Sequence, residues 1–218
     1  MRKFDCVIFD LDGTLLDTLD DLTKAVNHTM KVFGCPPHTK EEVRAFVGNG
    51  IGKLLERALP EEKRGEVGHA YGVFCEYYGE HFADETTPYA GMPALLSRLS
   101  RAGVRLGVVS NKAEFASLRL IEKFYPNTFG VVIGAREDLP KKPAPDGVLS
   151  AMQRLGAEKE RTVYVGDSDV DYYTAKNAGL PVAAVSWGFR PASDFASLPV
   201  YALCGDAAAL ERVLTEEI

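Results

Sequence analysis

Short apolar runs alternate along the chain with longer segments whose apolar residues follow a helical period. The run Val7-Ile8-Phe9 is uninterrupted, which is typical of a strand buried on both faces of a parallel sheet. Strands alternating with helices of this length predict an α/β fold with a doubly wound parallel sheet, a Rossmann-like core. Further strands are expected at Val104–Val109, Val131–Gly134, Thr162–Val165 and Pro181–Val185, with a weak last strand near Tyr201–Leu203.

Several helices are expected between these strands, at Met92–Ala102, about Ala113–Phe124, from Asp146, before Gly179 and at the end of the chain. In the helix that Asp146 opens, the spacing of the apolar residues predicts one buried side. That side is expected to carry Val148, Leu149, Met152 and Leu155.

Between the first two strands the chain shows helical periodicity alone. Thr39 followed by Glu42 is a capping box, which predicts the start of a short helix. Another helix is expected from about Glu61 to Phe82. Apolar residues at three- and four-residue spacing predict the first helix of this stretch: Leu19, Leu22, Ala25, Val26, Met30 and Phe33. A further helix is expected from Leu54, Leu55, Ala58 and Leu59.

The chain is therefore expected to have two parts. Residues 15–86 form an α-helical cap, and residues 1–14 together with 87–218 form the Rossmann-like core. We expect the cap to be inserted directly after the first strand.

Two carboxylates, Asp10 and Asp12, follow the first predicted strand. Residues i and i+2 of an extended segment point the same way, so the two side chains are expected to lie side by side. Adjacent carboxylates repel, which makes sense if a divalent cation lies there or if one carboxylate holds a proton. The alternative is a plain turn with Asp12-Gly13 as the turn dipeptide.

Polar residues also follow the later strands. Ser110-Asn111-Lys112 ends one strand, Lys142 lies in the loop after another, and Asp167 and Asp171 follow a third. Parallel sheets of this kind bind ligands outside the carboxyl ends of their strands. We therefore expect these side chains to converge with the first carboxylate pair.

The composition of the chain limits the kinds of molecule it is expected to bind and the compartment in which it is expected to lie. The net charge is −6 over 218 residues, which argues against nucleic-acid and anionic-membrane surfaces, because both need a basic patch. The first apolar run, Val7-Ile8-Phe9, is too short for a signal peptide or a membrane span. The cysteines are scattered without metal-ligand spacing, so reduced thiols and a cytoplasmic location are expected.

Taken in order, the polar motifs closely resemble those of the haloacid dehalogenase-like hydrolases, which are mostly Mg²⁺-dependent phosphatases. The motifs are Asp10-Leu11-Asp12-Gly13-Thr14, Ser110-Asn111-Lys112, Lys142-Pro143 and Gly166-Asp167-Ser168 with Asp171. The segments Val47-Gly48-Asn49-Gly50 and Arg57-Ala58-Leu59, with the Asn111-Lys112 pair, resemble phosphoglycolate phosphatases. The resemblance implies hydrolysis of a small phosphorylated metabolite, with phosphoglycolate as the leading expectation.

The resemblance also implies roles for the two carboxylates after the first strand. Asp10 would attack phosphorus to give an aspartyl-phosphate intermediate, and Asp12 would carry the proton to and from the reacting oxygens. Mg²⁺ would be held by the Asp10 side chain, the Asp12 carbonyl and Asp167, with Asp171 binding metal waters or orienting Asp167.

Phosphate would be held by Ser110, the Asn111 backbone N–H and Lys142, the last of which would also balance the charge of Asp10. In the expected cap, Asn49 and Arg57 are candidate substrate contacts.

Several alternatives stay open at this point. Asp167 and Asp171 fit helix N-terminal capping as well, and Ser110 and Asn111 fit a plain turn. Lys142 can be a solvated surface lysine, and Lys112 can belong to the site or lie outside it. Trp187-Gly188 is expected to serve packing rather than to border the site. The same scaffold suits a β-phosphoglucomutase-like phosphomutase or a pyrophosphatase, or a binding domain without catalysis. The chain is expected to be a monomer or a homodimer.

Overall fold

The computed structural model describes residues 3–215, and the chain divides into two compact units. One unit comprises Met1–Leu16 and Pro88–Ile218, and the other comprises Asp17–Thr87. These bounds differ by one or two residues from the ranges 1–14, 87–218 and 15–86 expected from the sequence.

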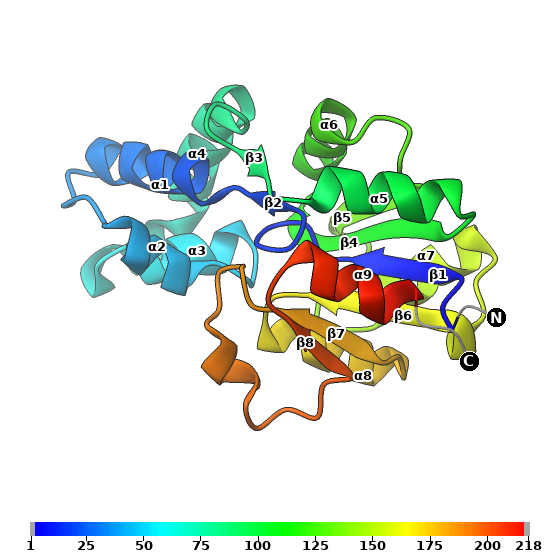
Figure 1. Ribbon diagram of the computed structural model, residues 1–218. Helices are drawn as coiled ribbons and strands as arrows, with labels where there is room; N and C mark the ends of the chain where they lie inside the picture. The colour runs from blue at the N-terminus through cyan, green and yellow to red at the C-terminus, as the bar shows by residue number, and fades with distance from the viewer. Residues whose placement is uncertain (1–2, 216–218) are drawn as a thin grey trace. The chain divides into compact units, whose positions relative to one another are not determined.

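The larger unit contains a six-stranded sheet in the order β5-β4-β1-β6-β7-β8, and all of its strand pairs are parallel (Figure 1). The α/β fold with a doubly wound parallel sheet is therefore confirmed. The strands are β1 (Cys6–Phe9), β4 (Arg105–Ala113), β5 (Val131–Ala135), β6 (Thr162–Gly166), β7 (Val182–Val185) and β8 (Ala202–Cys204).

The register of the central strands determines which residues meet at the edge of the sheet. Phe9, the last residue of β1, pairs with Val108 of β4 and with Val165 of β6. Asp10, Ser110 and Asp167 therefore come from neighbouring strands at nearly the same level. This edge lies where strand order reverses on either side of β1, the usual ligand-binding position of such sheets.

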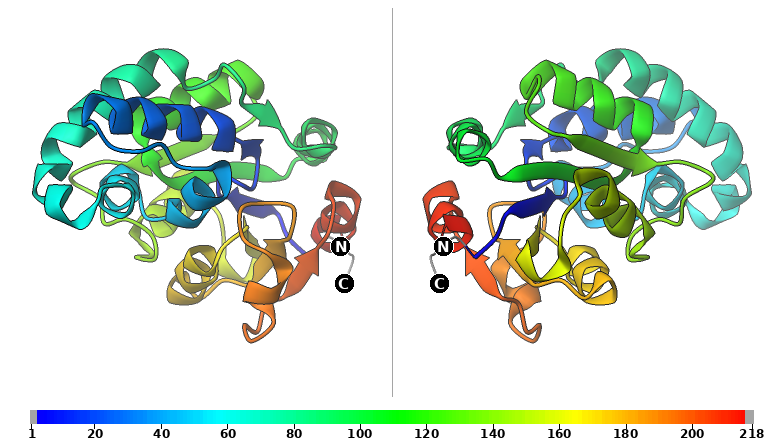
Figure 2. Two further views of the ribbon diagram at one scale, coloured as in Figure 1. Left: turned by 90° about the vertical axis from the view of Figure 1, so that its left-hand side faces the viewer. Right: turned by 90° about the vertical axis from the view of Figure 1, so that its right-hand side faces the viewer.

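Helices pack on both faces of this sheet. α7 and α8 lie together over β4, β5, β6 and β7, while α5 and α9 pack side by side on the other face (Figures 1 and 2). The helices of this unit are α5 (Met92–Arg101), α6 (Glu114–Phe124), α7 (Asp146–Leu155), η2 (Lys159–Arg161), α8 (Asp169–Ala178), η3 (Ala192–Phe195) and α9 (Ala207–Thr215).

The expectation that Leu149 lies on the buried side of α7 is wrong. Leu149 is 47% exposed, because the face that α7 turns to the sheet is made by Gly147, Val148, Ala151 and Met152. Gly147 allows the helix to approach closely: a Cβ there would lie 3.0 Å from a methyl carbon of Val109.

The smaller unit is mostly helical, with α1 (Leu19–Val32), α2 (Lys40–Phe46), α3 (Ile51–Ala58), η1 (Glu61–Glu66) and α4 (Val67–His81). The capping box of Thr39 and Glu42 is confirmed at the start of α2. The single helix expected from Glu61 is wrong, since Glu61–Glu66 has no buried residue to pack and forms a 3₁₀ turn before α4. The range 15–86 is also not wholly helical, because β2 (Leu16–Asp17) and β3 (Thr87–Pro88) form a two-stranded sheet.

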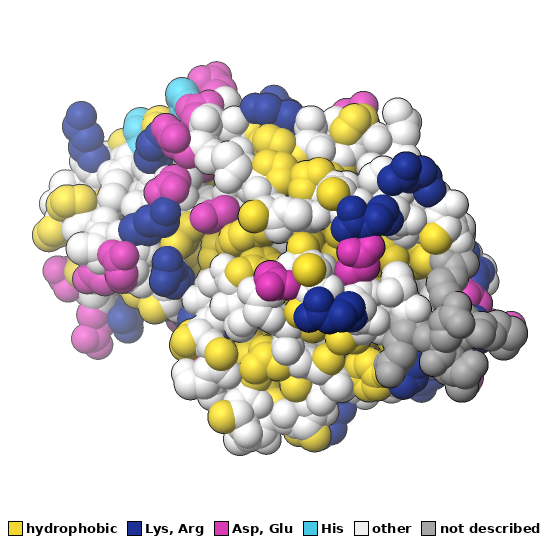
Figure 3. Space-filling view, viewed as in Figure 1, with side chains coloured by type: hydrophobic (Ala, Val, Ile, Leu, Met, Phe, Trp, Pro, Cys, Tyr) yellow, Lys and Arg dark blue, Asp and Glu magenta, His cyan; other side chains and the backbone are white. Residues whose placement is uncertain are grey.

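The described surface carries charges of both signs. On the face drawn in Figure 3, basic and acidic side chains are interspersed rather than separated into areas of one sign. Cys6, Cys35, Cys75 and Cys204 are free thiols. Within residues 3–215, no helix combines the length and the apolar character needed to cross a bilayer.

A buried carboxylate ties the two ends of the smaller unit together. Asp21, in the first turn of α1, accepts hydrogen bonds from the backbone N–H groups of Glu85 and Thr86 at 2.9–3.1 Å. It also accepts from the Thr86 hydroxyl at 2.7 Å, and only 1% of Asp21 is exposed. These bonds hold the beginning of α1 against the segment that follows α4.

We expect Asp21→Ala to lower the free energy of unfolding of the smaller unit by about 2–3 kcal/mol, because buried donors lose a charged acceptor. Urea denaturation and hydrogen exchange of the Glu85 and Thr86 amides measure the change. Asp20→Ala is the matched control: its side chain is 48% exposed and pairs with Lys40 at the surface, so little change is expected. Equal stability of the two variants would show that the Asp21 bonds do not stabilise this unit.

Candidate active site

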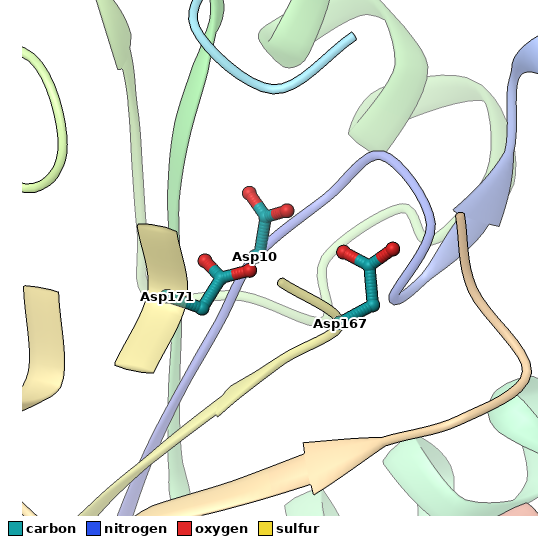
Figure 4. Close-up of side chains that lie close together, drawn as sticks. All are labelled: Asp10, Asp167 and Asp171. Atoms are coloured by element: carbon teal, nitrogen blue, oxygen red, sulfur yellow. The ribbon is translucent and has the colours of Figure 1, made fainter. Parts of the chain in front are cut away.

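Three buried carboxylates meet at the carboxyl edge of the sheet. Asp10 follows β1, Asp167 follows β6 and Asp171 lies in the first turn of α8. Each contributes an oxygen, and these oxygens lie within 4.8 Å of one another (Figure 4). Three carboxylates this close to one another repel unless a cation compensates their charge or protons neutralise it.

The ammonium group of Lys142 lies among these carboxylates. Its Nζ atom donates to Asp10 Oδ1 at 2.6 Å, to Asp171 Oδ1 at 2.7 Å and to the Tyr164 hydroxyl at 3.1 Å. The Lys142 side chain is 5% exposed. A loop that precedes α7 therefore supplies a buried positive charge to residues from β1, β6 and α8.

The charges do not balance. If ionised, the three carboxylates carry three negative charges against the one positive charge of Lys142, which leaves two in excess. The pKa of Asp10 is raised to about 7, mainly by burial, which the Lys142 ammonium opposes and the charge of Asp171 reinforces.

The same imbalance affects the other groups of the cluster. Burial, and then the charges of Asp171 and Asp10, hold the pKa of Asp167 well above its usual value. Burial lowers the pKa of Lys142, but the charges of Asp10 and Asp171 outweigh that effect and hold it well above its usual value, so the ammonium form persists. With its carboxylates ionised the cluster has excess negative charge, which a divalent cation would balance, and without a cation the raised pKa values favour protons there instead.

The Asp167 carboxylate is held by backbone that glycine alone permits. Its Oδ2 atom accepts a hydrogen bond from the Phe189 N–H at 2.6 Å. A Cβ on Gly188 would lie 2.4 Å from Asp167 Oδ2, and one on Gly13, whose φ is +85°, would lie 2.2 Å from the same atom. The loop after β7 and the turn after Asp12 therefore both depend on glycine to approach this carboxylate.

Asp171 uses both of its oxygens. Oδ2 accepts from the backbone N–H and the hydroxyl of Ser168, at 3.1 and 2.6 Å, and completes a capping box at the start of α8. Oδ1 accepts from Lys142 and from the Tyr164 hydroxyl. For Asp171 the sequence left helix capping and a place in the site as alternatives. In the structure Asp171 both caps α8 and contacts Lys142 within the carboxylate cluster.

The segment Ser110-Asn111-Lys112 lies within a strand, so the expectation that β4 ends at Val109 is wrong. β4 continues to Ala113, although its pairing with β5 shifts register between Val109 and Ala113. All three residues are buried. The Asn111 amide bonds to the main chain of Lys142 in both directions, accepting from its N–H at 2.9 Å and donating to its carbonyl at 3.1 Å.

Lys112 pairs with Asp12. Its Nζ atom lies 3.0 Å from Oδ1 and 3.3 Å from Oδ2 of that carboxylate. The Lys112 side chain is 4% exposed and the Asp12 side chain 14%. The two carboxylates after β1 therefore have different partners: Asp10 contacts Lys142, and Asp12 contacts Lys112.

Comparison with known families identifies this arrangement. Residues 7–185 match the family described as haloacid dehalogenase-like hydrolase. This chain belongs to the haloacid dehalogenase-like hydrolases. The match covers β4, β5, β6, β7 and all of β1 after Cys6, and with them every residue of the cluster described above.

Relatives of this hydrolase are phosphatases. Phosphoglycolate phosphatase of Aquifex aeolicus is 35% identical over 184 residues, which make up 84% of this chain and 85% of that protein. Phosphoglycolate phosphatase 1 of Pseudomonas aeruginosa is 37% identical over 195 residues, 84% of this chain and 70% of that protein. A crystal structure described as a candidate phosphoglycolate phosphatase of Lactobacillus delbrueckii subsp. bulgaricus matches with a TM-score of 0.94 at 32% identity, covering 100% of both chains. The chain is therefore a phosphatase of this family, and a small phosphorylated substrate is implied.

The donor set of this haloacid dehalogenase-like hydrolase fits a divalent metal ion. Carboxylate oxygens are the ligands that Mg²⁺ and Ca²⁺ prefer. Asp10, Asp167 and Asp171 supply them together with the excess negative charge described above. The cluster is consistent with a divalent metal site.

The two residues expected to contact substrate from the cap lie in the other unit of the hydrolase, Asp17–Thr87. Arg57 donates to the Asn49 side chain at 2.8 Å and to the Phe46 carbonyl at 2.6 Å. The guanidinium group thereby holds the loop between α2 and α3, and the pair forms one local structure within that unit.

Sequence reasoning missed two contributors to the site of this hydrolase. Tyr164 contacts Lys142 and Asp171, and Phe189 donates its N–H to Asp167. Trp187-Gly188, expected to serve packing, borders the site as well: Trp187 Nε1 donates to the Thr14 carbonyl at 3.2 Å, and a Cβ on Gly188 would lie 2.4 Å from Asp167 Oδ2. A tyrosine inside an apolar strand was a usable signal, because a buried phenol needs a hydrogen-bond partner. The backbone donor of Phe189 leaves no mark in the sequence.

Proposed function

We propose that this hydrolase removes phosphate from 2-phosphoglycolate, with Mg²⁺ and through an aspartyl-phosphate intermediate. The observation that carries the proposal is the buried Asp10 carboxylate, paired with Lys142 at 2.6 Å inside the acidic cluster. The names of the relatives support the choice of substrate.

In the first step an Asp10 oxygen attacks phosphorus and the bond between phosphorus and the ester oxygen breaks. Asp12 gives a proton to the departing oxygen, which leaves as the hydroxyl of glycolate. In the second step water attacks phosphorus, Asp12 takes a proton from that water, and the bond to Asp10 breaks. Inorganic phosphate is released, and both aspartates return to their starting state.

The other residues of the edge hold and neutralise the phosphoryl group. We assign Ser110 and the Asn111 N–H to its oxygens, and Lys142 to the charge shared by the phosphoryl group and Asp10. The reciprocal bonds between Asn111 and the Lys142 main chain support this assignment, because they fix the phosphate-binding strand to the loop that carries the ammonium.

Mg²⁺, held by Asp10, Asp167 and the Asp12 carbonyl, would neutralise charge on the phosphoryl oxygens. We assign Asp171 to the support of Lys142 and of the metal-binding carboxylates, because both of its oxygens are engaged by Lys142, Tyr164 and Ser168. Asn49 and Arg57 are the proposed substrate contacts of the smaller unit.

Incubation of the purified protein with 2-phosphoglycolate tests the proposal. We expect release of phosphate and glycolate in equal amounts with Mg²⁺, loss of activity on chelation and its return when Mg²⁺ is restored. Transfer of phosphate between positions of a hexose phosphate without free phosphate would favour a phosphomutase. Preferential cleavage of inorganic pyrophosphate would favour a pyrophosphatase.

A further inference from the structure

Lys112, which pairs with Asp12, is the charged residue of the site that the proposed steps do not use. The Lys112 ammonium is buried, and it lies 3.0 Å from an oxygen of the residue proposed to protonate the leaving group. A buried cation is costly unless it is paired, so a second lysine here needs a reason. Lys142 already supplies the charge that Asp10 and the phosphoryl group require.

The Lys112 ammonium lies against both oxygens of the carboxylate that must reach the leaving group. To pass its proton, Asp12 has to come within about 2.6–3.2 Å of the ester oxygen. Because Lys112 Nζ lies 3.0 Å from Asp12 Oδ1 and 3.3 Å from Oδ2, the ammonium then lies within roughly 6 Å of the ester oxygen.

That separation fits a particular kind of leaving group. A carboxylate joined to the ester carbon by a single bond extends about 3 Å from the ester oxygen, given ordinary C–C and C–O lengths. Its oxygens would then reach hydrogen-bond distance of the ammonium. A leaving group with a hydroxyl in place of the carboxylate offers no charge there.

Asp12 is also more exposed than the two carboxylates that pair with Lys142. Its side chain is 14% exposed, whereas the side chains of Asp10 and Asp171, which pair with Lys142, are 10% and 1% exposed. The two lysines are equally buried, with side chains 4% and 5% exposed, so the difference lies in their partners. Lys142 bonds to Asp10, Asp171 and Tyr164, whereas Lys112 pairs with Asp12, the carboxylate that a substrate can reach more easily.

We propose that Lys112 binds the carboxylate of the leaving group and so selects phosphate monoesters whose carboxylate is one carbon from the ester oxygen. This inference rests on the proposed function, and it names the residue that determines specificity. In the free protein the Asp12 carboxylate occupies the ammonium, and in the complex the substrate carboxylate would join it.

The test compares two esters of equal length. The ratio of kcat/KM for 2-phosphoglycolate to that for ethylene glycol monophosphate isolates the carboxylate contact, because effects of a mutation on Asp12 apply to both. We expect a ratio of about 10² in the wild type and of only a few in Lys112→Met. Lys112→Arg, which keeps a cation, should retain much of the preference. Lys176→Met, which removes an exposed lysine near the end of α8, should leave the ratio unchanged.

The outcomes separate the two proposals. A wild type that cleaves both esters equally, or a Lys112→Met protein that keeps the full ratio, would overturn the role of Lys112 while leaving the phosphatase proposal intact. A wild type that releases phosphate from neither ester overturns the proposed function and this inference with it.

A second measurement needs no variant. Glycolate should inhibit wild-type cleavage of ethylene glycol monophosphate competitively, and ethylene glycol should not. Equal effects of the two compounds would contradict a carboxylate-binding ammonium.

Discussion

Replacement of Asp10 by asparagine is expected to lower turnover of 2-phosphoglycolate by at least about 10⁴-fold, since loss of a nucleophile removes the covalent route. The substitution is nearly isosteric, and the amide oxygen can still accept from Lys142, whose Nζ lies 2.6 Å from Asp10 Oδ1. The fold should therefore persist while the chemistry stops. Release of inorganic phosphate, followed with excess enzyme over substrate, measures the loss.

The matched control for this variant is Asp169→Asn. Asp169 is an exposed carboxylate in the first turn of α8, only two residues from Asp167 and Asp171. Its neutralisation should change turnover by less than about twofold, because exposed charges are strongly screened. Turnover that survives in Asp10→Asn would rule out Asp10 as the nucleophile.

Replacement of Lys142 by methionine should have the largest combined effect on stability and activity. Removal of one partner of a buried ion pair costs about 3–5 kcal/mol, because the remaining charges are left without compensation. Here the loss leaves Asp10, Asp167 and Asp171 together without their ammonium. Activity should fall at least about 10³-fold, as expected when a charge that stabilises the transition state is lost.

Urea denaturation and phosphate release measure these two effects. Lys141→Met is the control, since Lys141 precedes Lys142 in the same loop but is exposed, and it should leave both properties nearly unchanged. A Lys142→Met protein as stable as this control would show that protons, and not Lys142, compensate the carboxylates.

Much of the fold could be predicted from local patterns. Apolar runs of strand length predicted the bounds of β1, β6 and β7 to within one residue, and Thr39 with Glu42 predicted the start of α2. These signals depend only on residues that are neighbours along the chain. Predictions were wrong where local pattern is ambiguous. The polar segment from Ser110 to Lys112 continues β4 instead of ending it, since neighbouring strands and buried partners compensate its polarity.

The sequence by itself determined the fold class and a short list of polar residues at strand ends, because periodicity and turn chemistry are local properties. Only the tertiary structure decided the partners: Lys142 with Asp10 and Asp171, Lys112 with Asp12, and the Phe189 N–H with Asp167. Asp10 and Lys142, 132 positions apart, meet because the Lys142 main chain is bonded to Asn111 of β4, the neighbour of β1 in the sheet. Strand order is a property of the packed sheet, so the sequence could name these side chains but not pair them.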